Sequence, residues 1–391
     1  MTSPHRFAHE SDHLAVVRLL ELPGLGPRRL LSMMREASPG DLLRRVESGR
    51  VPRRYAEFSR AWSATLASDL HRRSDDEIRD RLGDTRVLLV DDPDYPEHLR
   101  RDVDPPPALF VRGDVERLRR PGVAVVGTRH ATEYGRAAAS EIGRRLAIAD
   151  VDVVSGLALG IDAAAHRGAL AVRSPVDPLD ERGDPAVVRR SGAPVGVVAS
   201  GLDVVYPRAN GGLWRAVADA GVVISEAPPG TPPDRFRFPL RNRIIAALAR
   251  VVVVVESRAS GGSMITVDEA LKRGVPVMAV PGATTTRASE GTNRLLRDGA
   301  MVATSPDDVL AVLGLASIGA DPMMRELRVV PRDSDAAVLS VFAHDPLDLD
   351  RIVAACAPMT LGEVALSLGR LESWGWLRHT SGWFERVTIT T

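Results

Sequence analysis

The sequence predicts an α/β protein whose main part is a parallel β-sheet covered by helices on both faces. From Arg86 onward, short runs of β-branched residues recur, and each is followed by glycine and a stretch with helical spacing. The runs are nearly all apolar, as expected for strands that are buried on both faces. The predicted strands cover residues 123–126, 151–154, 195–199, 222–225, 251–255 and 275–280.

Residues 1–84 precede these strands and predict a helical domain. Leu14–Leu20 and Leu30–Met34 have the apolar spacing of amphipathic helices. We therefore expect helices in this part of the chain, which also contains Leu22-Pro-Gly-Leu-Gly-Pro27.

The α/β core is expected over residues 85–313, followed by a linker over 314–335. Inside the core, residues 173–190 are rich in Pro, Asp and Arg and poor in apolar residues, which predicts a surface insertion. Residues 336–391 contain three helical stretches and then Trp376–Val387, which has the pattern of a β-hairpin. Three helices and a hairpin predict a winged-helix domain.

Composition excludes several classes of protein. The 391 residues include 51 basic and 51 acidic side chains, so net charge gives no indication of a nucleic-acid partner. Lys272, the only lysine, is not part of a Gly-Lys-Ser/Thr loop, which excludes a P-loop ATPase. The single cysteine, Cys356, excludes an internal disulfide and a cysteine-based zinc cluster. No apolar run reaches the roughly 18–20 residues of a membrane helix, and no signal-peptide pattern is visible. A cytoplasmic protein without cofactor, metal ion or membrane partner is expected.

Small residues and turn formers follow four of the predicted strands. The carboxyl ends of parallel strands share one edge of the sheet, so we expect these loops to lie together. Glycine lets the backbone approach a ligand closely, and helix N-termini offer unpaired N–H groups. Four such loops predict a phosphate site, although α/β turns also need glycine for geometry alone. The residues assigned to this site are Gly127, Thr128, Arg129, Ser155, Gly156, Gly160, Ser200, Gly201 and Ser263.

The densest basic stretch adds a second group of candidates. Between Arg235 and Arg250 there are five arginines and no acid. Arginine binds phosphate bidentately, whereas Phe236 and Phe238 either stack on bases or belong to the core. Pro239 is expected to be the first residue of a helix. The candidates are Arg237, Arg241, Asn242 and Arg243, together with Arg208 from the turn-rich link that follows Gly201.

A catalytic site is not predicted. Asp162 and His166 are four residues apart and share one face of a helix. Such a pair can be catalytic, but it more often has a structural role near a helix N-terminus. The sequence contains no HExxH, no Gly-x-Ser-x-Gly and no cluster of carboxylates. We therefore expect no catalytic residues.

Taken together, these motifs resemble the DNA-processing protein A family (DprA, also called Smf). The resemblance covers about residues 86–313, and the motifs follow in the order of that family. They are 92–96, 104–107, 155–162, 165–170, 200–207 with Asn210, 225–230, 238–245, 262–266, 279–282 and 291–293. The turn at 22–27 and residues 336–391 are similar to the family's helix–hairpin–helix-like N-terminal domain and its C-terminal winged helix.

The resemblance implies an extended Rossmann-like core in a cytoplasmic homodimer. It further implies that the protein binds single-stranded DNA and delivers it to the RecA recombinase in natural transformation. Arg129 and Arg208 are the implied phosphate contacts, and residues 291–313 are the implied dimer surface. Two features depart from the family. Arginine replaces the lysine that often follows the Tyr-Pro motif, and the 173–190 insertion interrupts a stretch that is usually continuous, which implies altered access for DNA.

An enzyme is the alternative. Nucleotide-processing proteins of the lysine-decarboxylase-like (LOG) group have a related core and cleave nucleoside monophosphates with a Pro-Gly-Gly-x-Gly-Thr-x-x-Glu loop. Residues 260–269 read Ser-Gly-Gly-Ser-Met-Ile-Thr-Val-Asp-Glu and lack the proline and the third glycine of that loop. A third alternative, a scaffold that acts only through protein contacts, leaves the arginine cluster unexplained. Binding of single-stranded DNA without chemistry is therefore the expected function.

Overall fold

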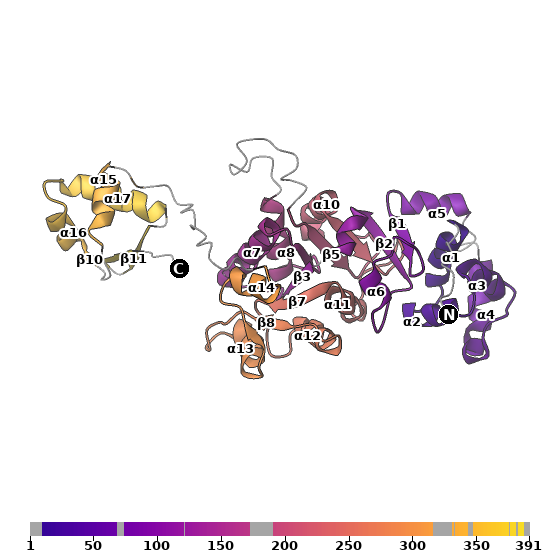
Figure 1. Cartoon of the computed structure of the whole chain (residues 1–391). Coiled ribbons are helices and arrows are strands. Elements are labelled where there is room, and N and C mark those ends of the chain that lie inside the picture. Colours follow the sequence, from indigo (N-terminus) through magenta and orange to yellow (C-terminus); the bar gives the residue numbers. More distant parts are fainter. Residues whose placement is uncertain are drawn as a thin grey trace. The chain divides into compact units, whose positions relative to one another are not determined.

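The computed structural model describes residues 10–68, 74–120, 122–172, 191–315, 331, 333–342, 347–374, 376–380 and 382–386. The chain forms two compact units, Met1–Ala316 and Ser317–Thr391, whose elements are labelled in Figure 1. The predicted insertion, 173–190, and most of the predicted linker, 314–335, lie outside the described residues.

The first unit is built on a nine-stranded sheet with the order β1-β2-β6-β5-β4-β3-β7-β8-β9. Its strands are β1 (Arg86–Leu89), β2 (Ala108–Gly113), β3 (Gly122–Val126), β4 (Asp152–Ser155), β5 (Pro194–Val198), β6 (Val222–Ser225), β7 (Ala249–Val254), β8 (Val277–Ala279) and β9 (Met301–Val302). Strands β3 to β9 are parallel, whereas β2 pairs antiparallel with both β1 and β6. The predicted, mostly parallel α/β fold is confirmed.

Helices cover both faces of this sheet (Figure 1). Alternate strand residues point to opposite faces, so Ala124 and Val126 pack with α11 and α12, whereas Val123 and Val125 pack with α7 and α8. Helix α10 extends the second layer toward β6, and α14 closes it near β7. The helices of the core are α6 (Glu97–Arg100), α7 (Glu133–Ile148), α8 (Ile161–Ala171), α10 (Gly211–Ala220), α11 (Arg237–Ala247), α12 (Gly262–Lys272), α13 (Glu290–Arg297) and α14 (Pro306–Val312).

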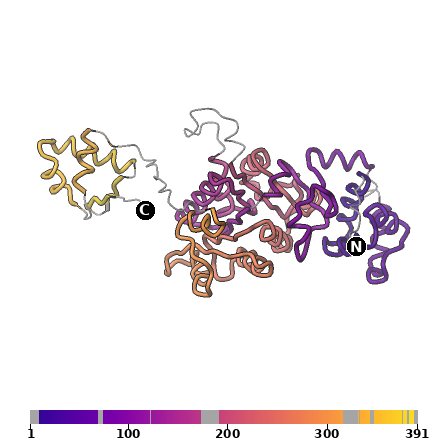
Figure 2. Tube along the Cα trace, viewed as in Figure 1, coloured from indigo at the N-terminus to yellow at the C-terminus, as the bar shows by residue number. Residues whose placement is uncertain are grey.

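The N-terminal helices belong to the same compact unit and lie beside β1 and β2 (Figure 2). They are α1 (Glu10–Leu20), α2 (Pro27–Met34), α3 (Pro39–Glu47), α4 (Ser59–Ala67) and α5 (Asp75–Leu82). The buried Trp62 holds them together, and its Nε1 donates a hydrogen bond to the Pro23 carbonyl oxygen at 2.8 Å. Leu14 of α1 and Leu82 of α5 pack in one cluster with Phe110 of the sheet. The helices and the sheet therefore share a core.

The described part of the second unit contains three helices and a small antiparallel sheet with the order β10-β12-β11. Its elements are α15 (Asp333–Ser340), β10 (Leu347–Asp348), α16 (Leu349–Ala355), α17 (Leu361–Ser373), β11 (Leu377–Thr380) and β12 (Trp383–Arg386). Phe342, Ile352, Leu368 and Trp376 form its core. The predicted helices and hairpin are present, and the assignment as a winged helix stays a prediction.

Two findings on the described residues bear on function. No helix among them is long and apolar enough to cross a membrane. No group of three or more His, Cys, Asp or Glu side chains in this part of the chain is arranged to hold a metal ion. The single cysteine, Cys356, is buried in the core of the second unit.

Candidate nucleic-acid interface

The strand order reverses at β3. Strands β4, β5 and β6 follow on one side of β3, and β7, β8 and β9 follow on the other. Open α/β sheets commonly bind ligands at such a point, outside the carboxyl ends of the strands. Here the backbone N–H of Thr128, after β3, donates to the carbonyl oxygen of Glu256, after β7, at 2.7 Å. The two loops that leave the reversal point are therefore joined at this edge.

Glycine is required at two positions where these loops meet. A Cβ on Gly127 would lie 2.6 Å from the Glu256 carbonyl oxygen. Gly160, which precedes α8, has a φ of +78°, and a Cβ there would lie 2.3 Å from the Thr128 carbonyl oxygen. Neither position accommodates a side chain. The close packing of the loops is by itself enough to require both glycines. The two glycines therefore show how the loops pack, and they do not indicate which ligand binds there.

An arginine and two aromatic rings form a ledge on this edge, which we call the aromatic ledge: Arg129, Tyr206 and Phe238. The Cζ atom of Arg129 lies 4.9 Å from the centroid of the Phe238 ring. The Phe238 and Tyr206 rings are 5.7 Å apart, and Tyr206 is 41% exposed. Arg129 is exposed and, among the described residues, forms no ion pair. The ledge thus combines an unneutralised cation with one exposed ring, that of Tyr206, and one half-buried ring, that of Phe238.

Three further predicted residues lie around the first turn of α11 or in the link before α10. Arg208 is exposed and has no ion pair among the described residues. Arg237 is half-buried, stacks on the exposed Phe236 with its Cζ 5.1 Å from the ring centroid, and has its pKa lowered by burial. Asn242 donates to the Gly262 carbonyl oxygen at 3.3 Å. Helix α11 begins at Arg237, so Pro239 lies inside the first turn and not at its start.

Arg241 lies buried behind the loop that follows β4. Its Nη1 donates to the Val197 carbonyl oxygen at 2.5 Å, and its buried Nε has no hydrogen-bond partner. Burial lowers the pKa of Arg241 to about 10, while the nearby Asp162 carboxylate opposes this shift and Arg129 adds to it. A Cβ on Gly156 would lie 1.9 Å from Nη1. The guanidinium is therefore a buried positive charge with incomplete hydrogen bonding.

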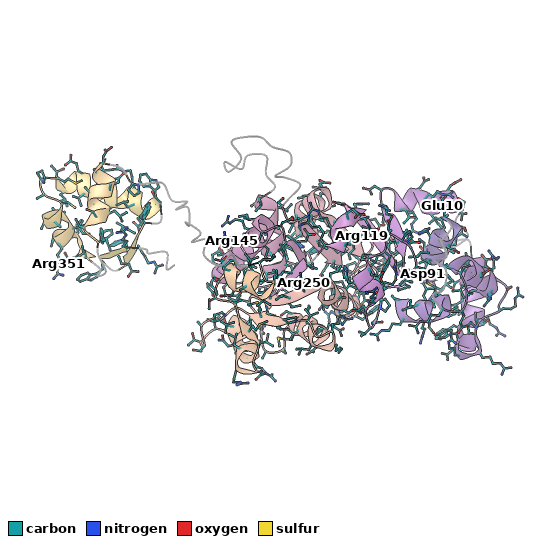
Figure 3. All side chains as sticks on the ribbon, in the orientation of Figure 1. Glu10, Asp91, Arg119, Arg145, Arg250 and Arg351 are labelled. Carbon is teal, nitrogen blue, oxygen red and sulfur yellow. The ribbon has the colours of Figure 1, made fainter. Side chains whose placement is uncertain are left out.

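Arg243, by contrast, has a structural role. It is 4% exposed, its Nη1 donates to the Asp104 carbonyl oxygen at 2.8 Å, and its Nη2 is paired with Glu226. Its Nε also lies 3.3 Å from the Asp104 carboxylate. Arg250, the last arginine of the basic stretch, is labelled in Figure 3. It is exposed near the start of β7, at the end of the sheet where the parallel strands begin. The basic stretch therefore does not form a single surface.

The predicted serines are buried, and their hydroxyl groups bond to the protein. Ser155 Oγ donates to the Val125 carbonyl oxygen at 2.6 Å, and Ser200 Oγ to the Val204 carbonyl oxygen at 2.7 Å. Ser263 Oγ lies 2.8 Å from Ser257 Oγ. The backbone N–H of Gly201 donates to the Thr231 carbonyl oxygen at 3.0 Å. These groups shape the loops, and the charged and aromatic side chains make up the accessible surface.

Asp162 and His166 do not bond to each other. The Oδ2 of Asp162 accepts from the backbone N–H groups of Gly156 at 3.1 Å and Ala158 at 3.4 Å. The Nε2 of His166 lies 3.3 Å from the Val195 carbonyl oxygen. Burial raises the pKa of Asp162 and lowers that of His166 to about 4. Both side chains hold backbone in place, which favours the structural interpretation.

Glu269, the glutamate of the loop considered for the alternative enzyme, is also bonded to neighbouring cations. Glu269 lies on α12, where its Oε1 is 2.7 Å from Lys272 Nζ and its Oε2 is 2.5 Å from Arg273 Nη1. These cations lower the pKa of Glu269 against the effect of burial.

Arg129 is the residue of the aromatic ledge that was among the predicted site residues. The role of Phe238 was left open between base stacking and the core, and Tyr206 was not considered as a contact. Its signal was an aromatic residue next to proline in a turn-rich link.

Comparisons with known proteins agree with this architecture. The sequence profile of the family described as DNA recombination-mediator protein A matches residues 86–314. Protein Smf of Synechocystis is 31% identical over 337 residues, covering 76% of this chain and 79% of that protein. DNA processing protein DprA of Streptococcus pneumoniae is 38% identical over 217 residues, covering 56% and 70%. The crystal structure of DNA processing protein A from the same species superposes with a TM-score of 0.61 at 30% identity, covering 78% of this chain and 98% of that one. The chain belongs to the DNA recombination-mediator protein A family.

Proposed function

We propose that this protein acts in DNA processing by binding single-stranded DNA at the aromatic ledge, without chemical turnover. The observation that carries the proposal is the exposed Arg129, which stacks on Phe238 and has no carboxylate partner among the described residues. A guanidinium neutralises phosphate, and exposed rings stack on unpaired bases. Arg208 and Arg237 extend the positive surface on either side. Relatives named DNA processing proteins support DNA as the ligand.

We also propose that the protein is a homodimer that passes the bound strand to the RecA recombinase. The description of the family as a recombination mediator supports the transfer. The exposed end of the sheet supports the dimer, because β9 is an edge strand and its two residues, Met301 and Val302, are 38% and 50% exposed. Val312 and Leu315 add further exposed apolar area. Unpaired strand edges and apolar patches suit a second copy of the chain.

Titration with labelled single strands at several salt concentrations tests the DNA proposal. Counterion release predicts a log–log slope of about −0.7 per phosphate neutralised, or roughly −3 to −4 for four to six contacts. Arg129→Ala and Arg208→Ala should each weaken binding and flatten the slope by about 0.7, because each removes one phosphate contact. Single strands should bind more tightly than duplex, since only their bases are free to stack.

Arg250→Ala is the matched control. Arg250 is an exposed arginine near the start of β7, at the end of the parallel strands opposite the aromatic ledge. Its removal should therefore leave both the affinity and the salt slope unchanged. Wild-type affinity in a folded Arg129→Ala/Arg208→Ala double variant would place the site elsewhere. Release of free base from a nucleoside monophosphate would instead favour the enzyme.

A further inference from the structure

A pocket of about 270 Å³ lies between the N-terminal turn and the start of α11. The turn Leu22–Pro27, which leads into α2, forms one wall, and α11 forms the other. The ends of β5 and β6 form the floor through Val198, Ala199, Ser225 and Glu226. Phe236, Arg237 and Arg241 line the pocket, and the first two of these residues also lie next to Phe238 of the aromatic ledge in the sequence.

We propose that this pocket holds one unstacked nucleobase of the bound strand, so that the N-terminal helices take part in DNA binding. The proposal rests on the proposed function, because it assigns one further contact to the same ligand. The two sites are neighbours: Phe238 of the ledge and Phe236 of the pocket are two residues apart, which limits their Cα atoms to about 7 Å. The pocket therefore lies within the reach of a strand that is held at Arg129.

The volume of the pocket suits a ligand about the size of one nucleobase. Pockets for drug-sized molecules are roughly 300–1,000 Å³, and this pocket, at about 270 Å³, lies just below that range. One base fits this space better than a whole nucleotide with its sugar and phosphate. Two large apolar side chains of the lining, Phe236 and Leu240, are 56% and 39% exposed. A planar ring covering them would remove apolar surface from water, which is the usual gain when a base stacks on protein.

The polar groups of the lining favour a base over an apolar side chain or a lipid chain. Arg241 is 7% exposed, and its buried Nε has no hydrogen-bond partner in the protein. Glu226 faces the same pocket, with Oε1 paired to Arg243. A guanidinium donates hydrogen bonds and a carboxylate accepts them. The edge of a base offers partners for both, because it presents carbonyl acceptors and amino donors.

Gly26→Leu tests the proposal by filling the pocket from the N-terminal wall. A Cβ at Gly26 meets no atom within 4 Å, and the backbone there has a φ of −74°, which any residue adopts. The control is Gly369→Leu on α17 of the second unit, where a Cβ also meets nothing within 4 Å. Circular dichroism and thermal melting establish that both variants are folded.

The DNA probes are oligothymidines of about six nucleotides, near the short end of known single-strand sites. One series carries a single abasic residue, moved along the strand. Wild-type protein should lose about tenfold in affinity when the abasic residue falls at the pocket, which corresponds to about 1.4 kcal/mol. Gly26→Leu should lose about tenfold on the intact strand and should no longer respond to that abasic position. Gly369→Leu should behave as wild type.

The outcomes separate the two proposals. If wild-type protein does not bind the intact strand, the proposed function is wrong. If it binds with the expected salt slope, but every abasic strand binds equally and Gly26→Leu matches wild type, only the base pocket is overturned. A Gly26→Leu variant that binds weakly yet keeps the wild-type response to abasic residues also overturns the pocket, because its loss then arises elsewhere.

Discussion

Among single residues, burial decides what each arginine of the interface does. Arg243 is enclosed with Glu226 and Asp104, and removing it would leave a buried carboxylate without its partner. Arg241 is also enclosed, but its Nη1 is bonded to a backbone carbonyl oxygen, that of Val197. Arg129 is exposed and rests on an aromatic ring. One residue type therefore supplies a structural ion pair, a buried charge and an exposed charge, the last of which we propose as a DNA contact.

His166 should make the stability of the first unit depend on pH. Burial lowers its pKa from 6.5 to about 4, so the folded protein holds the neutral imidazole. As pH falls below 6.5, the unfolded chain takes up a proton that the folded chain accepts only near pH 4. The free energy of unfolding should fall across that interval by up to about 3 kcal/mol, at 1.36 kcal/mol per pKa unit. Urea unfolding at a series of pH values measures this fall in the free energy of unfolding.

Comparing the wild-type protein with His166→Gln isolates the contribution of the His166 imidazole to the pH dependence of stability. Asp152 acts in the opposite direction, because burial raises its pKa to about 6 and its stabilising contribution is lost as pH rises from about 4 through 6. Asp152 is present in both proteins, so the difference between their unfolding free energies should report His166 alone. A difference that does not change between pH 7 and pH 4 would mean that the imidazole titrates normally in the folded state.

The sequence predicted which loops lie together, but not which of their side chains are exposed. Glycine-rich loops after buried strands share one edge, since parallel strands end together. Whether a side chain there points outward depends on packing between distant segments. Ser155 has its hydroxyl bonded to Val125 of the neighbouring strand, and Arg241 has its guanidinium against Gly156. Local spacing carries no signal for either contact, and the DNA-contacting role of the exposed Arg129 stays a prediction.

At the scale of elements, the predicted strands are those that are buried on both faces. Strand β3 is buried at each of its five residues, and its run of apolar residues was recognised from sequence. Strand β9 is two residues long and exposed, and β1 begins with the exposed Arg86. An edge strand lacks the continuous apolar pattern because one of its sides has no partner. Strands β1 and β9 were therefore not among the predicted strands. Strand β2 was not predicted either, although it lies between β1 and β6 and its first four residues are buried.

The exposed edge at β9 leads to a prediction on assembly. Val302→Asp should convert the proposed dimer into a monomer, because it buries an unpaired charge in the contact between copies. Light scattering after size-exclusion chromatography measures the molar mass directly. Val103→Asp is the control, since Val103 is 75% exposed and lies outside this edge. A Val302→Asp protein that keeps the molar mass of a dimer would show that the copies pair elsewhere.

For the whole molecule, the two units present different surfaces. The described part of the second unit exposes Leu361, Glu363, Leu366 and Glu372 along α17. Arg370, the basic residue of this helix, is bonded to Asp335 at 2.6 Å. A helix that reads DNA needs a basic face, because phosphate repels carboxylates. The surface of α17 is therefore better suited to a protein partner than to DNA.

Removal of residues 317–391, the whole second unit, should change the affinity for single-stranded DNA less than threefold, or under about 0.7 kcal/mol. The reason is that the aromatic ledge and the pocket belong entirely to the first unit. Fluorescence anisotropy with the same oligonucleotides compares the truncated and complete proteins, with molar mass measured in parallel. A loss of tenfold or more in a truncated protein that is folded and has the molar mass of the complete protein's oligomer would mean that the second unit binds DNA.

The contact between Gly156 and Arg241 has a consequence for how these positions change over evolutionary time. The guanidinium occupies the space that any side chain at position 156 would need. A lineage that acquires alanine at 156 while keeping arginine at 241 must move the buried guanidinium out of this space. Shortening residue 241 first opens the space but removes the buried cation. We therefore expect the two positions to change together among related sequences.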